Sequence, residues 1–379
     1  MTLTEYTSSL FRVSGLRGIP LSGTFELTSR CNLDCRMCYV HLRKNDAQAM
    51  KNELPADEWL KIAAEAAGAG TLFILLTGGE PLLRPDFSEI YLGCKKLGLI
   101  VSVNTNGTLI DEKTADLFAS SPPARINLTL YGCSSKTYGS LCGHPDAYQR
   151  ARTALRLLTE RGIRVKLNHT VTAFNAADTD AIRKIGAEYG LPVQTASYLF
   201  PPLRASGSLS KNEARLSPEE AAKVRFDFDI GRFSPEEAEK RVRLFLAGLR
   251  PAGYEAECGG HPTEGISCRA GDSAFWITAN GEMRPCGMME SPSFPVRSGF
   301  SEGWEYLRTA RRSVTMPARC TACRDRFSCE VCPASAYAET GKENEAPPYL
   351  CRMTKKFTDL CAAYVRKRNA ASPDEKETK

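Results

Sequence analysis

GTFELTSRCNLDCRMC, residues 23–38, joins a short apolar strand to three cysteines at the spacing CxxxCxxC. Iron–sulfur clusters are held by cysteine thiolates, normally four for a [4Fe-4S] cluster. Three thiolates therefore predict a cluster with one iron open to an external ligand. Zinc is the alternative, because it normally takes four ligands and His41 is a conceivable fourth. The three cysteines are Cys31, Cys35 and Cys38.

From residue 21 to residue 200, short apolar segments alternate with longer amphipathic ones, which is typical of repeated β-α units. Ala151, Ala154, Leu155 and Leu158 fall on one face of such a predicted helix. The pattern predicts an α/β fold, a partial (β/α)6 TIM-like barrel with its chemistry at the C-terminal strand ends. The predicted strands are 23–28, 71–78, 100–105, 125–132, 164–171 and 193–199.

The composition is that of a globular protein of 379 residues with a formal charge of +6. The chain shows neither an apolar run of about 20 residues nor a secretory signal, so we expect a cytoplasmic protein without a membrane partner. Cluster-bound thiolates would cancel most of the positive charge, and no nucleic-acid partner is inferred. Fifteen cysteines without an export signal favour metal binding over disulfides.

Helix-start motifs and a cysteine-rich region suggest how the rest of the chain is organised. Two S-P-E-E motifs, at 217–220 and 234–237, each predict a helix that begins after a capping serine. The cysteine-rich region lacks long apolar runs, so bound metal is expected to supply folding energy. The predicted parts are an N-terminal segment (1–20), the barrel (21–200), a helical connector (201–257), an auxiliary-cluster domain (258–355) and a C-terminal helix with a disordered tail (356–379).

Polar residues and glycines follow several predicted strands. In TGGEP (77–81), Gly78 and Gly79 allow close backbone approach, and Glu80 offers an acceptor for an ammonium group. A simple turn is the alternative for each such strand end. The other polar residues singled out at strand ends are Asn104, Asn106, Thr129 and Asn168.

The cysteine triad and the GGE motif together resemble the radical S-adenosylmethionine (SAM) enzymes. The resemblance implies that SAM chelates the open iron of a [4Fe-4S] cluster on Cys31, Cys35 and Cys38, and that its reductive cleavage yields a 5′-deoxyadenosyl radical. An aromatic residue is common in the family where Met37 stands here, which is a mild departure. The residues that the resemblance implies for SAM binding are Met37, Gly78, Gly79, Glu80, Asn104, Asn106, Thr129 and Asn168.

The C-terminal cysteines resemble the SPASM extension of peptide-modifying radical enzymes, with one residue fewer between Cys329 and Cys332. The resemblance implies two auxiliary [4Fe-4S] clusters, hence three clusters in all. Two zinc ribbons are the alternative. The implied ligand sets are Cys258, Cys268, Cys286 and Cys332 for the first auxiliary cluster, and Cys320, Cys323, Cys329 and Cys351 for the second.

The remaining cysteines receive simpler interpretations. Cys94 and Cys361 lie in predicted helices and are expected to be small buried side chains. Cys133 and Cys142 flank the exit of the fourth predicted strand, on the presumed substrate side.

The favoured function is an oxidoreductase of ribosomally made peptides (RiPP maturation) that forms a thioether, a carbon–carbon crosslink or a similar bond. An anaerobic sulfatase maturase is one alternative, weakened by Gly287, since those enzymes tend to have Asp after the cysteine matching Cys286. A non-catalytic Fe-S or zinc scaffold is another. The expected partners are a peptide or protein substrate and an electron donor such as flavodoxin or ferredoxin. Because only 30 residues precede the triad, a leader peptide is expected to dock on the barrel, on the basic connector or on a separate leader-binding protein.

Overall fold

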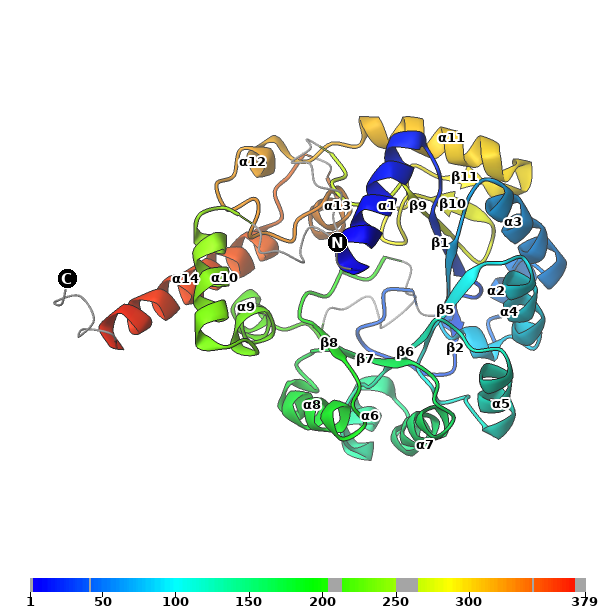
Figure 1. Cartoon of the computed structure of the whole chain (residues 1–379), viewed down its shortest axis with the longest axis horizontal. Helices are drawn as coiled ribbons and strands as arrows, with labels where there is room; N and C mark the ends of the chain where they lie inside the picture. The colour runs from blue at the N-terminus through cyan, green and yellow to red at the C-terminus, as the bar shows by residue number, and fades with distance from the viewer. Residues whose placement is uncertain (1–2, 41, 204–212, 250–264, 343, 372–379) are drawn as a thin grey trace. The chain divides into compact units, whose positions relative to one another are not determined.

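The computed structural model describes the chain except for residues 1–2, 41, 204–212, 250–264, 343 and 372–379 (Figure 1). Cys258, His41 and most of the predicted tail therefore lie outside the described residues. The chain forms two compact units: unit 1 comprises 1–9, 216–268 and 314–379, and unit 2 comprises 10–215 and 269–313. Among the described residues, no helix combines the length and apolar character needed to cross a membrane.

Unit 2 contains the predicted barrel. Six strands pair in parallel in the order β1-β4-β5-β6-β7-β8, and the expected α/β partial barrel is confirmed. Each strand matches a predicted apolar segment to within a few residues, so the carboxyl ends of all six meet at one edge. The strands are β1 (Ser22–Glu26), β4 (Phe73–Thr77), β5 (Ile100–Thr105), β6 (Arg125–Thr129), β7 (Val165–Thr170) and β8 (Val193–Ala196).

Three further strands extend the sheet beyond β1 and were not predicted from the sequence. β9 (Ala274–Ile277) pairs in parallel with β1, and β10 (Glu282–Arg284) and β11 (Phe294–Pro295) follow in antiparallel order. Residues 269–313, the first part of the predicted auxiliary-cluster region, thus group with the barrel. These strands are only two to four residues long, too short for a clear periodicity, and the barrel partner of β9 is β1, at the other end of the sequence.

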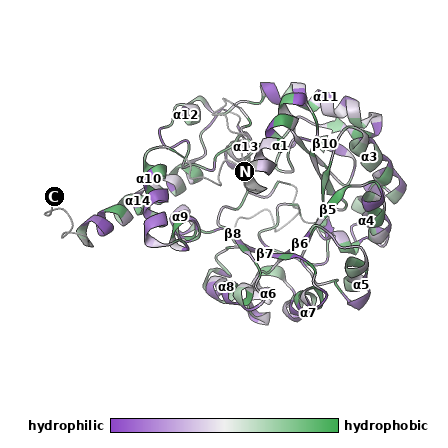
Figure 2. Ribbon diagram, viewed as in Figure 1, coloured by the Kyte–Doolittle hydropathy of each residue, from purple (hydrophilic) through white to green (hydrophobic). Residues whose placement is uncertain are grey.

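Amphipathic helices cover the outside of the sheet, and Figure 2 shows hydrophilic and hydrophobic residues alternating along them. Ala151, Ala154, Leu155 and Leu158 are all fully buried on α7, as their spacing predicts. The helices of unit 2 are most of α1 (Leu3–Arg17), α2 (Ala47–Asn52), α3 (Ala56–Gly68), α4 (Phe87–Lys96), α5 (Glu112–Ser120), α6 (Ser135–Cys142), α7 (Ala147–Glu160), α8 (Thr179–Glu188) and α11 (Phe300–Ala310). Short connections include β2 (Arg30–Cys31), β3 (Leu42–Arg43), η1 (Pro81–Leu83), η2 (Ala176–Asp178), η5 (Val296–Ser298) and η6 (Arg311–Ser313).

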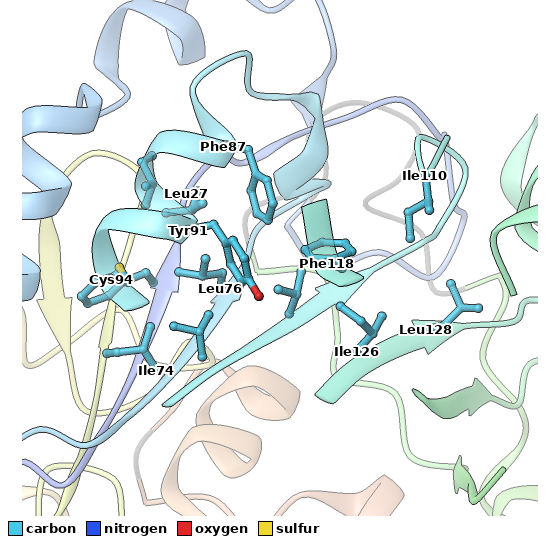
Figure 3. Close-up of a cluster of buried hydrophobic side chains, with 14 of the residues drawn as sticks. Leu27, Ile74, Leu76, Phe87, Tyr91, Cys94, Ile110, Phe118, Ile126 and Leu128 are labelled. Atoms are coloured by element: carbon cyan, nitrogen blue, oxygen red, sulfur yellow. The ribbon is translucent and has the colours of Figure 1, made fainter. Parts of the chain in front are cut away.

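The core between sheet and helices fixes which side chains face the barrel interior. Ile74 and Leu76 of β4 point toward α4, where Tyr91 packs edge-on against Phe118 of α5 at 5.4 Å (Figure 3). Successive side chains of a strand alternate between its faces, so the residues between these apolar ones line the interior. That alternation brings Thr77, Asn104, Asn127 and Asn168 to the inner face.

Unit 1 is helical in its described part. Both S-P-E-E predictions are confirmed: Ser217 accepts a hydrogen bond from the Glu220 N–H in a full capping box, and Ser234 accepts one from the Glu237 N–H. The connector is less basic at its surface than its composition suggests, because Arg225 and Arg241 are buried and bond Asp229. The elements are α9 (Pro218–Phe226), η4 (Asp227–Gly231), α10 (Pro235–Leu246), α12 (Ala318–Thr321), α13 (Pro333–Thr340) and α14 (Pro348–Ala371).

Candidate functional site

The triad loop begins at the C-terminal edge of the barrel. Cys31 belongs to β2, and the loop then bends so that the Cys38 N–H donates to the Cys35 carbonyl at 3.0 Å. The end of α6 supports this loop, since the Asp34 N–H donates to the Cys142 carbonyl at 2.9 Å. Backbone hydrogen bonds thus help to hold the loop in place.

The three thiols lie close together in a largely buried environment. Burial raises the pKa of the Cys31 thiol well above its ordinary value, and the neighbouring Cys35 and Cys38 raise it further. For Cys35, a hydrogen bond with the Cys142 thiol is the main cause of its raised pKa, followed by burial. Metal ligation requires thiolates and releases their protons, so positively charged iron would offset the cost of burying these charges.

The donor set fits a cluster. In the described part of the chain, no three His, Cys, Asp or Glu side chains converge as ligands of one metal ion would. Thiolates that hold a [4Fe-4S] cluster bind different irons and do not need to meet at one point. When bound there, the cluster would supply one electron at low potential to a ligand of its open iron.

The end of β5 reaches the first cysteine directly. The Asn106 amide donates to the Cys31 sulfur at 3.7 Å and to the Asn32 side-chain oxygen at 3.1 Å. The Asn32 amide in turn donates to the Thr108 hydroxyl at 2.8 Å. The predicted strand-end residue Asn106 and the cysteine loop therefore form one hydrogen-bonded structure.

Glu80 is completely buried at the end of β4. Its carboxylate accepts hydrogen bonds from the Thr105 hydroxyl at 2.8 Å, the Asn106 N–H at 2.8 Å and the Leu82 N–H at 3.1 Å. Burial raises its pKa to about 7 despite these donors. Because a carboxylate accepts about four hydrogen bonds, roughly one position remains for a ligand ammonium.

Gly78 and Gly79 lie against the backbone that enters the cysteine loop. A Cβ on Gly78 would lie 2.4 Å from the Thr28 carbonyl oxygen, and one on Gly79 would lie 2.4 Å from that of Arg30. Only glycine fits at these two positions, because the obstacle is backbone and cannot rotate away. The glycines thus bring the end of β4 against the start of the triad loop.

The remaining predicted strand-end residues line the same interior. Thr129 of β6 is in register with Asn168 of β7, and the Asn168 carbonyl accepts the Leu130 N–H at 3.0 Å. Asn104 of β5 accepts the Asn127 amide at 2.7 Å. Met37 is half-buried beside the core, adjacent to Cys38.

Two further polar residues have unpaired buried atoms: Asn127, which was not predicted as a SAM contact, and Arg152, a weaker candidate for the SAM carboxylate. The Asn127 side-chain oxygen and one terminal nitrogen of Arg152 are buried without a hydrogen-bond partner among the described residues. An unpaired buried polar atom is costly and rare, so such atoms indicate a site for a bound polar group. Asn127 lies in the middle of β6, so the pattern of polar residues at strand ends does not reveal it.

The cysteines outside the predicted cluster sites are buried or half-buried. Cys94 and, in unit 1, Cys361 are fully buried, as predicted. Cys142 is also buried, beside Cys35, so its thiol faces the triad loop. Cys133 is half-buried, and its N–H donates to Asp178 at 2.8 Å.

Within unit 1, four predicted ligands surround one cavity. A space of about 360 Å³ is lined by Cys320, Cys323, Cys329 and Cys351, with Arg319 and Arg326 beside them. Burial is the main cause that raises the pKa of Cys320 to about 11, and the other three thiols add to it. Four thiols around one cavity fit the donor set of a [4Fe-4S] cluster.

The other predicted auxiliary set stays a prediction, because its members are divided between the two units and the undescribed residues. Cys258 lies outside the described residues, Cys286 belongs to unit 2, and Cys268 and Cys332 belong to unit 1. Cys332 caps α13, where its sulfur accepts the Ser335 N–H at 3.4 Å. No described cysteine forms a disulfide.

Comparison with known proteins defines the class. Residues 25–185 match the Radical SAM superfamily. The chain is 26% identical to the AdoMet-dependent heme synthase of Methanosarcina barkeri over 86% of this chain and 94% of that protein, and 24% identical to the PqqA peptide cyclase of Rhizobium meliloti over 88% and 87%. The structure of Streptococcus suis SuiB bound to its precursor peptide SuiA superposes with a TM-score of 0.66, at 19% identity over 90% of this chain and 79% of that one.

The β-α barrel with its triad and GGE turn is a radical SAM domain. The protein is an enzyme of the radical SAM maturase type, which binds SAM and a [4Fe-4S] cluster. The scaffold alternative is therefore not retained.

Proposed function

We propose that this enzyme oxidatively modifies a ribosomally made peptide and uses SPASM-type auxiliary clusters to do so. The observation that carries the proposal is the cavity lined by Cys320, Cys323, Cys329 and Cys351, on the same chain as a radical SAM domain. The similarity to a peptide cyclase along most of both chains supports the same substrate class.

The proposed roles of the barrel residues follow from their positions. Cys31, Cys35 and Cys38 would hold the SAM-binding cluster, which when reduced would give one electron to SAM. Cleavage of the sulfonium C–S bond of SAM would then leave methionine and a 5′-deoxyadenosyl radical, which removes a substrate hydrogen atom. Asn106 orients Cys31, and Glu80 keeps the ends of β4 and β5 together. The proposed SAM contacts are Met37, Gly78, Gly79, Glu80, Asn104, Asn106, Thr129 and Asn168, and Arg152 is added for the SAM carboxylate because of its unpaired nitrogen.

Two auxiliary [4Fe-4S] clusters complete the proposal, giving three in all. The ligand sets are Cys320, Cys323, Cys329 and Cys351 for one, and Cys258, Cys268, Cys286 and Cys332 for the other. A flavodoxin or ferredoxin would reduce the SAM-binding cluster, and a separate leader-binding protein would present the peptide.

A specific contact disfavours formylglycine formation. A Cβ on Gly287 would lie 2.7 to 2.9 Å from three ring atoms of Trp276. The Trp276 N–H donates to Glu26 at 3.0 Å, so the ring is held in place. The position after Cys286 therefore has no room for the aspartate expected of a sulfatase maturase.

A second candidate is the oxidation of a tetrapyrrole, favoured by similarity to heme synthases along nearly their whole length. The two candidates differ in substrate and can be separated by binding. If an iron porphyrin binds in a defined pocket of the protein, its absorption bands should shift in a saturable way during a titration.

One experiment tests the proposed function and distinguishes it from the second candidate. The enzyme is reconstituted anaerobically with iron and sulfide and then given SAM, dithionite and the peptide encoded by a neighbouring short reading frame. Peptide modification predicts a product lighter by the hydrogen atoms removed, seen by mass spectrometry, with 5′-deoxyadenosine formed in step. An unchanged peptide combined with porphyrin binding and oxidation would favour the second candidate.

A further inference from the structure

A buried ion-pair network lies beneath the triad loop. The Glu53 carboxylate accepts two hydrogen bonds from Arg30, from Nε at 2.7 Å and from Nη2 at 2.9 Å. Arg84 approaches the same carboxylate at 3.6 Å, and the side chains of all three residues are at least nine-tenths buried. Bidentate pairs between arginine and a carboxylate fix direction as well as distance.

Arg30 is the residue immediately before Cys31, and its side chain bridges both ends of the loop. Its Nη1 donates to the Lys44 carbonyl at 2.8 Å, just after β3 returns from the loop. Thr28 adds a second tie, because its hydroxyl donates to Glu53 and accepts the Arg30 N–H. The orientation that Glu53 imposes on Arg30 therefore fixes where the loop starts and where it ends.

The backbone of the same residues holds the GGE turn. The Glu80 N–H donates to the Arg30 carbonyl at 2.9 Å, and the Gly79 N–H donates to the Thr28 carbonyl at 2.7 Å. Glu80 then bonds Asn106, which reaches the Cys31 sulfur. A displacement of Arg30 would therefore reach Cys31 both directly and through the GGE turn.

Arg84 anchors the network to the barrel. It donates to the carbonyls of Leu27 at 2.9 Å and Leu54 at 3.0 Å, and it forms a two-point ion pair with Asp86. The two arginines and two carboxylates balance in charge. Removing the charge of Glu53 would leave a cation buried without its partner, which is strongly unfavourable.

We propose that Glu53 is a positioning residue for the SAM-cleaving centre: by orienting Arg30, it sets Cys31 and the GGE turn at the separation that SAM binding needs. The inference rests on the proposed roles of Cys31 and of the GGE turn. Glu53 is not a proposed ligand of the cluster or of SAM. It acts mainly through Arg30, with Thr28 and Arg84 as its other partners.

The test compares Glu53→Gln with Glu58→Gln in the reconstituted holoenzyme. Glu58 forms a two-point pair with Arg297, with distances of 2.6 and 3.2 Å, but that pair lies on the barrel's outer surface. Iron content, melting temperature, the SAM-induced change in the electron paramagnetic resonance (EPR) spectrum of the reduced cluster, and the KM and kcat for 5′-deoxyadenosine release with dithionite are measured. Arg30→Lys, which keeps the charge but loses the two-point pairing, is the second variant in case Glu53→Gln does not fold.

The proposal predicts that Glu53→Gln retains most of its iron but has a KM for SAM raised about tenfold and an altered SAM-induced EPR change, with Arg30→Lys intermediate. Glu58→Gln should match the parent enzyme in both. An unchanged KM and an unchanged EPR signature in Glu53→Gln, with only a lower melting temperature, would overturn the proposal. A parent enzyme that forms no 5′-deoxyadenosine would overturn the proposed function and this inference together.

Discussion

The Asn106 amide donates to the Cys31 sulfur across 3.7 Å, and this contact joins the third barrel strand to the cysteine loop. The two residues are 75 positions apart in the sequence, and the parallel sheet brings them together. Hydrogen bonds to a cluster thiolate stabilise its negative charge and so influence the potential of the cluster. Asn106 would therefore belong to the cluster environment proposed at Cys31 as well as to the proposed SAM site.

Asn106→Ala should weaken SAM cleavage. The variant loses a hydrogen bond to a charged group, worth about 1.5 kcal/mol or more, which corresponds to roughly a tenfold decrease in kcat/KM for 5′-deoxyadenosine formation. The EPR spectrum of the reduced cluster should shift as well. Asn52→Ala, at an exposed position on α2, is the control and should change neither. Parent-like values in Asn106→Ala would remove this residue from the site.

Gly287→Ala should destabilise unit 2. The added methyl group would press on the Trp276 ring, and overpacking of this kind costs about 1 to 3 kcal/mol. The measurement is urea unfolding, followed by tryptophan fluorescence, since all three tryptophans lie in unit 2. Gly68→Ala in α3 is the matched control, because its new methyl group meets nothing within 4 Å and should leave stability equal or higher. Equal stability of Gly287→Ala and the parent would show that the position tolerates a side chain.

His169 should make stability fall in mild acid. Burial lowers its pKa to about 4 from an ordinary 6.5, so only the unfolded chain gains a proton as the pH falls through 6.5. The contribution of neutral His169 to the free energy of unfolding is fully present above pH 6.5 and is lost as the pH falls toward 4. Between pH 7.5 and 5.5 the loss is about 1.4 kcal/mol.

The check is urea unfolding of the parent and His169→Gln at both pH values. The variant should lose less stability on acidification by about that amount. Identical pH dependence in parent and His169→Gln would contradict the prediction.

Cys323→Ala combined with Cys351→Ala should remove one auxiliary cluster. Both residues are exposed at the rim of the unit 1 cavity, so the substitutions leave the core intact. The double variant should hold about four irons fewer than the parent and still release 5′-deoxyadenosine, while losing peptide product. Cys133→Ser serves as the control for cysteine loss. Full iron retention in the double variant would refute the cavity as a cluster site.

Much of the barrel could be predicted because its information is local. The six apolar segments, the buried face of α7 and the two capped helices follow from periodicity and end signals within a dozen residues. β9 to β11 could not be predicted, because the pairing of Ala274–Ile277 with Ser22–Phe25 depends on long-range packing.

The candidate site divides in the same way. The triad and the GGE turn are contiguous motifs, but the interior amide Asn127 and the Glu53 carboxylate act through partners distant in the sequence. Glu53 looks like an ordinary helix-flanking residue until the fold brings it to Arg30. Spacing therefore identifies the groups proposed to hold a cluster, while the residues proposed to orient them emerge only from the folded chain.

The most direct test of the central claim is 5′-deoxyadenosine release by a variant in which Cys31, Cys35 and Cys38 are all replaced by Ala. The parent, reconstituted anaerobically, should hold about 12 irons and cleave SAM with dithionite. The triple variant should hold about four fewer and release no 5′-deoxyadenosine. A triple variant that keeps its full iron content or still cleaves SAM would contradict the account.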